Sequence, residues 1–248
     1  MKNISVGFNG GTPVSSVVLK GLNLHVKAGE FVVIIGGNGT GKSTLFNVIA
    51  GLVRPTSGRV IIGGEDVTKI SQHGRSGHIA RVTQEISRGT MANLTIFENL
   101  SFASMRGKCR GLLPHSNALR RKVFSEKLAS FGIGLENRMH NLVGNLSGGQ
   151  KQMVSLLMAV LSESKILLLD EITAALDPKI AEKVMEFANK IVGRENKTTL
   201  MVTHNMSHAI KYGDRTLVLA DRHFAREFHG AEKKALTPAS LAEIFNEI

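Results

Sequence analysis

The chain has 248 residues, which is enough to bury a sizeable core as one large domain or two small ones. Its longest apolar runs, 31–35 and 166–169, are far shorter than the roughly 20 residues of a membrane-spanning helix, and its start carries no apolar signal segment. Its 31 lysines and arginines outnumber 20 acidic residues, and the formal net charge of +11 indicates an anionic partner: nucleotide phosphates, an anionic membrane face or nucleic acid.

A glycine-rich loop joins the apolar run 31–35, an expected strand, to the helical pattern 44–52. Residues 36–43 fit the pattern G-x-x-x-x-G-K-[S/T] in the strand–loop–helix context that gives it meaning. Backbone N–H groups of such a loop wrap a β-phosphate, Lys42 brings charge toward the β- and γ-phosphates, and the Ser43 hydroxyl is a ligand for Mg²⁺. We therefore expect ATP and Mg²⁺ as cofactors, bound by Gly36, Asn38, Gly39, Thr40, Gly41, Lys42, Ser43 and Thr44.

Four further apolar runs indicate strands later in the chain. Because these runs are nearly continuous and lie beside helical patterns, they predict an α/β fold with a buried, mostly parallel sheet covered by helices. The stretch from about 85 to 162 has few strand signals and several helical ones, which predicts a helical insertion between two strands. The expected strands are 78–83, 165–169, 198–203 and 215–220.

Polar side chains stand where three of these strands end, at Gln84, Asp170 and His204. In open α/β sheets the ligand crevice lies at the carboxyl ends of the strands. We expect Asp170 to hold Mg²⁺ directly or through water, and the adjacent Glu171 to accept a proton from an attacking water. His204 is expected to contact the γ-phosphate. Gln84 is expected to touch Mg²⁺ or water and to connect the site with the helical insertion.

The loop "LSGGQ", residues 146–150, opens another helical pattern. Two adjacent glycines before a helix let backbone N–H groups approach an anion closely. The loop at 36–43 already supplies one phosphate site, so the residues alone leave open which phosphate this second loop serves.

A denser basic stretch, 105–122, contains the single cysteine, Cys109. One cysteine excludes an internal disulfide and suits a reducing cytosol. The stretch lacks interleaved aromatic residues, so a stacking platform for single-stranded nucleic acid is unsupported. Two interpretations stay open for it: a solvated basic face, or a contact with a membrane partner or acidic lipid.

The end of the chain predicts a short amphipathic helix. Thr237 and Pro238 form a typical helix entry. The apolar residues that follow form a single stripe at helical spacing, which we expect to dock on the domain itself. They are Leu241, Ile244, Phe245 and Ile248.

Taken together, the motifs resemble the nucleotide-binding subunit of the ATP-binding cassette (ABC) transporter family. The glycine-rich loop, Gln84, "LSGGQ", "LLLDE" (167–171), "AALD" (174–177) and His204 stand in that family's order and spacing. The resemblance extends to about residue 225.

The resemblance implies a P-loop NTPase core with a mostly parallel sheet, an antiparallel N-terminal β part and an inserted α-helical subdomain. It implies one ABC ATPase domain over 1–248. Within it, the expected parts are a core at 1–84 and 162–225, a helical subdomain with the signature loop at 85–161, and a tail at 226–248.

Family members pair head to tail, so that the signature loop of one subunit closes on the ATP held by the other. The resemblance therefore implies that Ser147, Gly148 and Gly149, with Gln150 beside them, bind the γ-phosphate in trans, and that Asp177 lies across the interface. One chain carries one loop of each kind, so a two-fold dimer makes two complete sites. Phe8 is the candidate for the aromatic residue, usually tyrosine, that stacks on adenine.

The sequence departs from the usual family pattern at four positions. Methionine stands at 153 and 158, where arginine is usual. Ile172 and Ala174 replace the proline and serine of "DEPTSALD". None of these changes removes a phosphate ligand.

Several segments are similar to the ATPase subunits of importers grouped as tryptophan/tyrosine transport systems. They are "GKCRGL" (107–112), "LLMAVL" (156–161), "LLDEITAALDPK" (168–179), "TTLMVTHNM" (198–206) and "EKKALT" (232–237). The similarity implies import of a small solute such as an amino acid.

An importer subunit implies three partners: a second ATPase subunit, an integral membrane permease and, indirectly, a substrate-binding protein. We expect the chain at the cytoplasmic face of the membrane, docked through residues near Gln84, and we expect no nucleic acid. The apolar docking candidates are Met91, Leu94, Ile96 and Phe97. The alternatives are an exporter ATPase or a soluble ABC ATPase of iron–sulfur assembly or translation. A nucleic-acid repair ATPase would need a longer coiled-coil insertion than 85–162.

Overall fold

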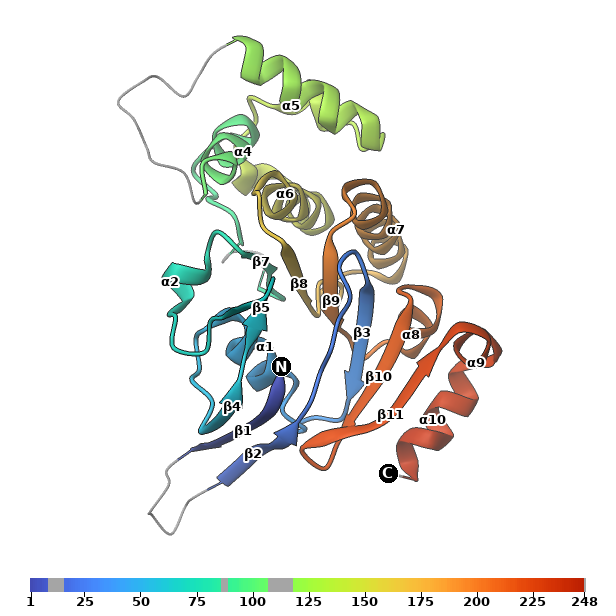
Figure 1. Ribbon diagram of the computed structural model, residues 1–248. Coiled ribbons are helices and arrows are strands. Elements are labelled where there is room, and N and C mark those ends of the chain that lie inside the picture. The colour runs from blue at the N-terminus through green and yellow to red at the C-terminus, as the bar shows by residue number, and fades with distance from the viewer. Residues whose placement is uncertain (9–15, 86–88, 107–117, 248) are drawn as a thin grey trace.

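A six-stranded sheet forms the centre of the computed structural model, which describes residues 1–8, 16–85, 89–106 and 118–247 (Figure 1). Its order is β11-β10-β3-β9-β8-β7; the last five strands are mutually parallel and β11 is antiparallel to β10. The predicted mostly parallel sheet is therefore confirmed. The strands are β3 (Phe31–Gly36), β7 (Ile79–Val82), β8 (Ile166–Asp170), β9 (Thr198–Val202), β10 (Arg215–Ala220) and β11 (His223–His229).

The central strands are buried because helices cover both faces of the sheet. In β3, Phe31, Val33 and Ile35 join one apolar cluster, whereas Val32 and Ile34 join another, as alternating side chains of a strand must. Helix α1 (Lys42–Ala50) packs in the second cluster. Helices α6 (Gly148–Leu161), α7 (Pro178–Glu195) and α8 (Met206–Lys211) pack in the first.

Antiparallel strands from the start of the chain form the β part that the family resemblance implies. The three-stranded sheet has the order β2-β1-β4, and β5 and β6 form a short ribbon. Ile4, Val6 and Leu19 of this part are buried in the same apolar cluster as residues of α1. The strands are β1 (Lys2–Phe8), β2 (Ser16–Leu22), β4 (Ser57–Arg59), β5 (Ile61–Ile62) and β6 (Glu65–Asp66).

Between β7 and β8 the described chain is helical. Figure 1 shows α4 and α5 at the end of the molecule away from β1 and β2. Thr95 and Glu98 form a reciprocal capping box at the start of α4. Of the four docking candidates, Ile96 and Phe97 are buried and face the core, so they cannot form a docking surface; Met91 and Leu94 remain partly exposed. The elements are α4 (Ile96–Ser104), α5 (Ala118–Phe131) and the 3₁₀ turns η1 (Glu136–Arg138) and η2 (Val143–Asn145).

Two of the sequence predictions fall partly outside the described residues. Cys109 and most of the basic stretch 105–122 lie there. Within the part of the chain that the structure describes, no helix has the length and apolar character needed to span a membrane.

The C-terminal segment docks on the domain, as its apolar stripe predicts. Leu241 of α10 (Pro238–Asn246) is fully buried, and Ile244 and Phe245 pack against the core; Ile248 lies outside the described residues. Strand β11 and helix α9 (Gly230–Ala235) were not predicted, and the tail boundary at 226 falls inside β11. Lys233 of α9 donates to the carbonyls of Tyr212 (2.6 Å) and Gly213 (2.8 Å).

A buried arginine holds the end of α1, the helix that follows the glycine-rich loop. Arg75, the last residue of α2 (Gln72–Arg75), is 1% exposed. Its Nη1 donates to the carbonyls of Val48 (2.7 Å) and Ile49 (2.6 Å), and its Nη2 to the carbonyl of Val67 (2.5 Å). Since the last carbonyls of a helix have no helical partner, Arg75 supplies the donor for Ile49, while the Val48 carbonyl also accepts from the Gly51 N–H.

We predict that Arg75→Met destabilises the protein by about 1–3 kcal/mol, because the buried Ile49 carbonyl loses its donor, whereas the Val48 and Val67 carbonyls keep backbone donors. Arg75→Lys, with fewer donors, should lose less. Urea unfolding followed by circular dichroism measures both variants. Arg59→Met, on the exposed part of β4, is the control. Equal midpoints for Arg75→Met and Arg59→Met would contradict this role.

Candidate functional site

Four neighbouring strands bring the predicted polar residues to one edge of the sheet. β3, β9, β8 and β7 are parallel and adjacent, so their carboxyl ends share an edge. Gly36 ends β3, His204 follows β9, Asp170 ends β8, and Gln84 lies exposed two residues beyond β7. The residues that the sequence analysis selected at strand ends therefore lie together, at or just after the carboxyl ends of four neighbouring strands.

The loop between β3 and α1 needs glycine at its two ends. A Cβ on Gly36 would lie 2.6 Å from the Leu219 carbonyl oxygen, so no larger residue fits. Gly41 precedes α1 with a φ of 101°, in the left-handed region that glycine adopts without strain. Asn38, Gly39 and Ser43 are exposed, while Thr40 and Thr44 are partly buried. The loop therefore presents its backbone, and the unpaired N–H groups of the first turn of α1, to an anion.

Lys42 is buried in this loop and shares the site with two carboxylates. Its Nζ donates to the carbonyls of Gly36 (2.8 Å) and Gly37 (2.7 Å). Burial lowers the pKa of Lys42, and the charges of Glu171 and Asp170 oppose that shift. The ammonium group is thus held over the loop and within electrostatic reach of both acids.

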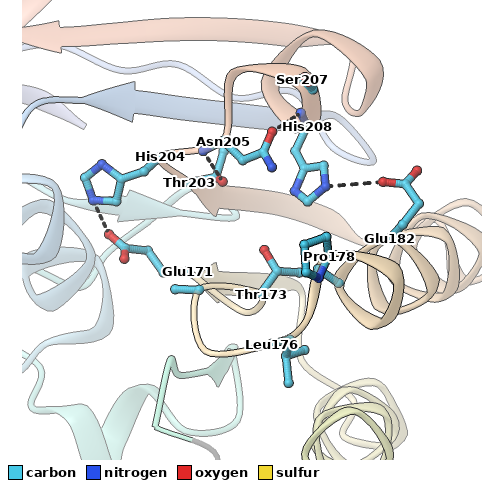
Figure 2. A pocket seen from close by; sticks show the side chains of 12 residues that line it. Glu171, Thr173, Leu176, Pro178, Glu182, Thr203, His204, Asn205, Ser207 and His208 are labelled. Carbon is cyan, nitrogen blue, oxygen red and sulfur yellow. Dashed lines mark hydrogen bonds and ion pairs between the residues drawn. The ribbon is translucent and has the colours of Figure 1, made fainter.

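Glu171 and His204 are in hydrogen-bonding contact, which the sequence analysis did not predict. The distance from Glu171 Oε1 to His204 Nε2 is 2.7 Å (Figure 2). Glu171 has a φ of 48°, which is unusual for a residue other than glycine and typical of functional sites. Its N–H donates to the Val202 carbonyl at 3.0 Å, which ties this turn to the end of β9. Glu171 is 17% exposed and His204 44%, so both reach solvent.

Asp170 has a partner that sequence reasoning missed. Arg81 of β7 donates through Nη2 to Asp170 Oδ2 at 2.5 Å and through Nη1 to Asn47 Oδ1 at 2.8 Å. An arginine inside the otherwise apolar run 78–83 was the available signal. Asp170 Oδ1 receives no hydrogen bond from the residues that the structure describes.

The second glycine loop caps its own helix. Ser147 Oγ accepts from the Gln150 N–H, and Gln150 Oε1 accepts from the Ser147 N–H, which makes a capping box at the start of α6. Ser147 and Gly148 are exposed, but Gly149 is buried, and a Cβ there would lie 2.3 Å from Ile180 of α7. The exposed helix start is therefore the part of this loop available to an anion.

Asp177 and Phe8 complete the predicted set. Asp177 is exposed and caps α7, since its Oδ1 accepts from the Lys179 N–H at 2.9 Å. Phe8, at the end of β1, is 41% exposed and so has a face available for stacking. Tyr212, the only tyrosine, is buried. The departures from the family pattern at Met153, Met158 and Ile172 pack against or within the core, whereas Ala174 is exposed.

A cavity of about 580 Å³ adjoins Glu171 and His204. Glu182 and His208 form part of its wall, and His208 Nε2 lies 3.3 Å from Glu182 Oε2 (Figure 2). Glu182 also accepts hydrogen bonds from Tyr212 (2.8 Å) and from Lys211. Burial lowers the pKa of His208, and Glu182 opposes that shift. This cluster ties α7 to α8, the two helices that follow Asp177 and His204.

The residues at the strand edge fit Mg²⁺ with a nucleotide. Within the described ranges no group of three or more His, Cys, Asp or Glu residues is placed to hold a metal ion. Mg²⁺ in nucleotide sites needs no such group, because it is bound by one or two protein oxygens together with phosphates and water. The exposed hydroxyl of Ser43 and the carboxylate of Asp170 are oxygen donors of this kind.

Comparisons with known proteins identify the family of the chain. Residues 19–174 match the family described as ABC transporter, and residues 143–208 also match a family described as an AAA domain. The chain is 40% identical over 247 residues to a tyrosine transport ATP-binding protein of Clostridioides difficile, covering 99% of this chain and 97% of that protein. It is 34% identical to the longer spermidine/putrescine import ATP-binding protein PotA of Spiroplasma citri, of which it spans 63%.

Solved structures give the same result. A dimeric structure of the ATP-binding cassette MJ0796, in a post-hydrolysis state bound to ADP and Pi, superposes with a TM-score of 0.76 and 33% identity, covering 92% of this chain and 97% of that chain. MJ0796 is an uncharacterized ABC transporter ATP-binding protein of Methanocaldococcus jannaschii, 35% identical over 236 residues. The chain therefore belongs to the ABC transporter family, as an ATP-binding subunit that hydrolyses ATP.

Proposed function

We propose that this subunit pairs head to tail with a second ATP-binding subunit and that hydrolysis in the pair drives a separate membrane permease. The permease imports a small solute, and an amino acid is the class that best fits. The support for the solute is the tyrosine transport relative, whose similarity covers nearly its whole length. The support for a pair is the similarity to dimeric cassettes.

The observation that carries this proposal is that phosphate-binding groups occur on two separate helix starts. One, at α1, belongs to the strand edge with Lys42, Glu171 and His204. The other, at α6, is exposed at Ser147 and Gly148. A two-fold dimer gives each exposed start a nucleotide to close on, and it completes two sites.

Within one site, each side chain has a distinct task. Ser43 and Asp170 would hold Mg²⁺, which when bound would offset the negative charge of the phosphates. Glu171 takes the proton of the attacking water on its carboxylate, and His204 Nε2 holds that carboxylate in place at 2.7 Å. Across the interface, Ser147 and the α6 N–H groups stabilise the γ-phosphate.

The remaining assignments follow the same arrangement. Phe8 stacks on adenine, Gln84 links metal or water to the helical part, and Asp177 lies at the dimer interface. Met91 and Leu94, which are partly exposed ahead of α4, dock the permease. The subunit is then held at the cytoplasmic face of the membrane by its permease, and a substrate-binding protein delivers the solute on the other side.

We expect Glu171→Gln to retain ATP binding and to lose turnover by about 10²–10⁴-fold, the usual contribution of a positioned general base. Phosphate release and binding of a fluorescent ATP analogue measure the two effects separately. Glu186→Gln makes the same chemical change on an exposed position of α7 and serves as the control. Lys42→Ala should lose nucleotide affinity instead. If a homogeneous Glu171→Gln preparation hydrolyses ATP at the wild-type rate, Glu171 is not the general base.

Dimerisation is tested in the Glu171→Gln background, where ATP persists. We expect a dimer with ATP and a monomer with ADP by light scattering, because only ATP offers a γ-phosphate to the second subunit. Adding Ser147→Arg should abolish the dimer, since a bulky cation fills the α6 start. Thr95→Arg disrupts an equivalent capping box at α4 and should leave dimerisation intact. A Ser147→Arg dimer with ATP bound would refute the trans arrangement.

Permease docking is tested with Met91→Asp combined with Leu94→Asp. Vesicles holding the permease should recruit the wild type and not the double variant, because two buried charges would oppose an apolar contact. ATP hydrolysis by the isolated subunit should stay near wild type. Leu52→Asp with Ile70→Asp, two exposed apolar positions elsewhere, is the matched control. Recruitment of the double variant, or equal binding to empty anionic vesicles, would show that the docking surface is misplaced.

A further inference from the structure

One arginine joins the three elements that carry the proposed metal-binding residues. Arg81 lies on β7, and its guanidinium donates to Asp170 Oδ2 on β8 (2.5 Å) and to Asn47 Oδ1 on α1 (2.8 Å). Both ends of the ion pair are largely shielded, with the Arg81 side chain 19% exposed and that of Asp170 14% exposed. The fork of the guanidinium thus bridges α1 to β8 from β7; Figure 1 labels these three elements.

Stability alone does not explain an arginine at this position. Ile79, Ala80 and Val82, its neighbours on β7, are all buried apolar residues. A shielded ion pair is often no more stabilising than an apolar pair of similar volume. In addition, Arg81 Nε is buried with no hydrogen-bond partner, which is unfavourable. If position 81 served only the stability of the core, an apolar side chain would be sufficient there. The hydrogen bonds to Asp170 and Asn47 therefore indicate a role other than stability.

The groups that Arg81 holds lead directly to the phosphate site. Asn47 lies four residues after Ser43, on the same face of α1 one turn further along. Arg81 itself stands three residues before Gln84. Since Asp170 uses only Oδ2 for Arg81, its Oδ1 is left available. Arg81 therefore contacts the carboxylate of Asp170 and the helix that carries Ser43, and it lies on the strand that precedes Gln84. These are the three residues assigned to the metal.

We propose that Arg81 is a positioning residue for Mg²⁺: by binding Asp170 through one oxygen and α1 through Asn47, it sets Asp170 and Ser43 in the arrangement that the metal needs. This inference rests on the proposed function, in which Ser43 and Asp170 hold Mg²⁺. Partners that orient a metal ligand by hydrogen bonding contribute substantially to metal affinity without touching the metal.

The sign of the effect separates positioning from simple electrostatics. A nearby positive charge repels a divalent cation, so its removal would strengthen Mg²⁺ binding if charge alone mattered. Positioning predicts the reverse, because Asp170 loses the partner that fixes its orientation. Arg81→Lys distinguishes the two further: it keeps the charge but lacks the fork that reaches two acceptors at once.

The experiment measures the dissociation constant of a fluorescent ATP analogue with Mg²⁺ and with a chelator, so that the ratio gives the Mg²⁺-dependent gain in affinity. For Arg81→Met we expect chelator values near wild type and a gain reduced by about 10-fold or more, in the range of other orienting partners. Arg81→Lys and Asn47→Ala should reduce the gain less. Arg59→Met, an exposed arginine of β4, controls for the lost charge and should leave the gain unchanged.

Every outcome decides the question. If the wild type shows no Mg²⁺-dependent gain, the proposed metal site fails and this inference fails with it. If the wild type shows the gain and Arg81→Met retains or exceeds it, the metal site stands and the positioning role is overturned. Thermal unfolding checks that Arg81→Met is folded; if it is not, Arg81→Lys and Asn47→Ala carry the test, and an unchanged gain in both overturns the proposal.

Discussion

The shared direction of β3, β9, β8 and β7 is the constraint on which the site depends. The site residues lie where the chain leaves the carboxyl end of each strand. The parallel pairing brings these four strand ends to one edge of the sheet. The pairing is enforced by burial, because residues on the two faces of β3 join two different apolar clusters. A slip of one residue in strand register would exchange these two faces, and it would also displace the residues at the carboxyl ends of the strands.

Several motif residues also serve the local structure that presents them. Ser147 caps α6 while leaving the start of that helix exposed, and Asp177 caps α7. Gly149 permits α6 to approach Ile180 of α7, whatever anion the loop binds. Replacing such a residue disturbs the helix cap as well as the loop that it presents. Variants at this loop therefore need a control variant that removes a cap at another helix.

Prediction from sequence succeeded where a pattern has one physical cause. Short apolar runs rich in β-branched residues and set between helical patterns are typical of buried strands, and the glycine-rich loop needs its strand and helix. Strand β11 was missed because "HFAREFH" has scattered polar residues and is mostly exposed. The Arg81–Asp170 pair was missed because it depends on the register of β7 against β8, and the Glu171–His204 pair because it depends on the turn at Glu171. Neither register nor a left-handed φ can be read from residue types alone.

The two adjacent carboxylates at the end of β8, Asp170 in the strand and Glu171 just after it, have partners of different chemical capacity. Asp170 is bound by an arginine, whose guanidinium only donates, so one oxygen of this carboxylate is held in place. Glu171 contacts a histidine, the side chain whose ordinary range of protonation lies nearest neutral pH, at a more exposed position. The positive φ at Glu171 turns the chain away from the strand, so that consecutive acids meet different elements: β7 in one case, the connection after β9 in the other. A carboxylate that binds a metal ion must stay deprotonated during the reaction, whereas a general base must take up a proton. The partners of Asp170 and Glu171 divide these two requirements between neighbouring residues, and this supports assigning the metal to the first and the proton to the second.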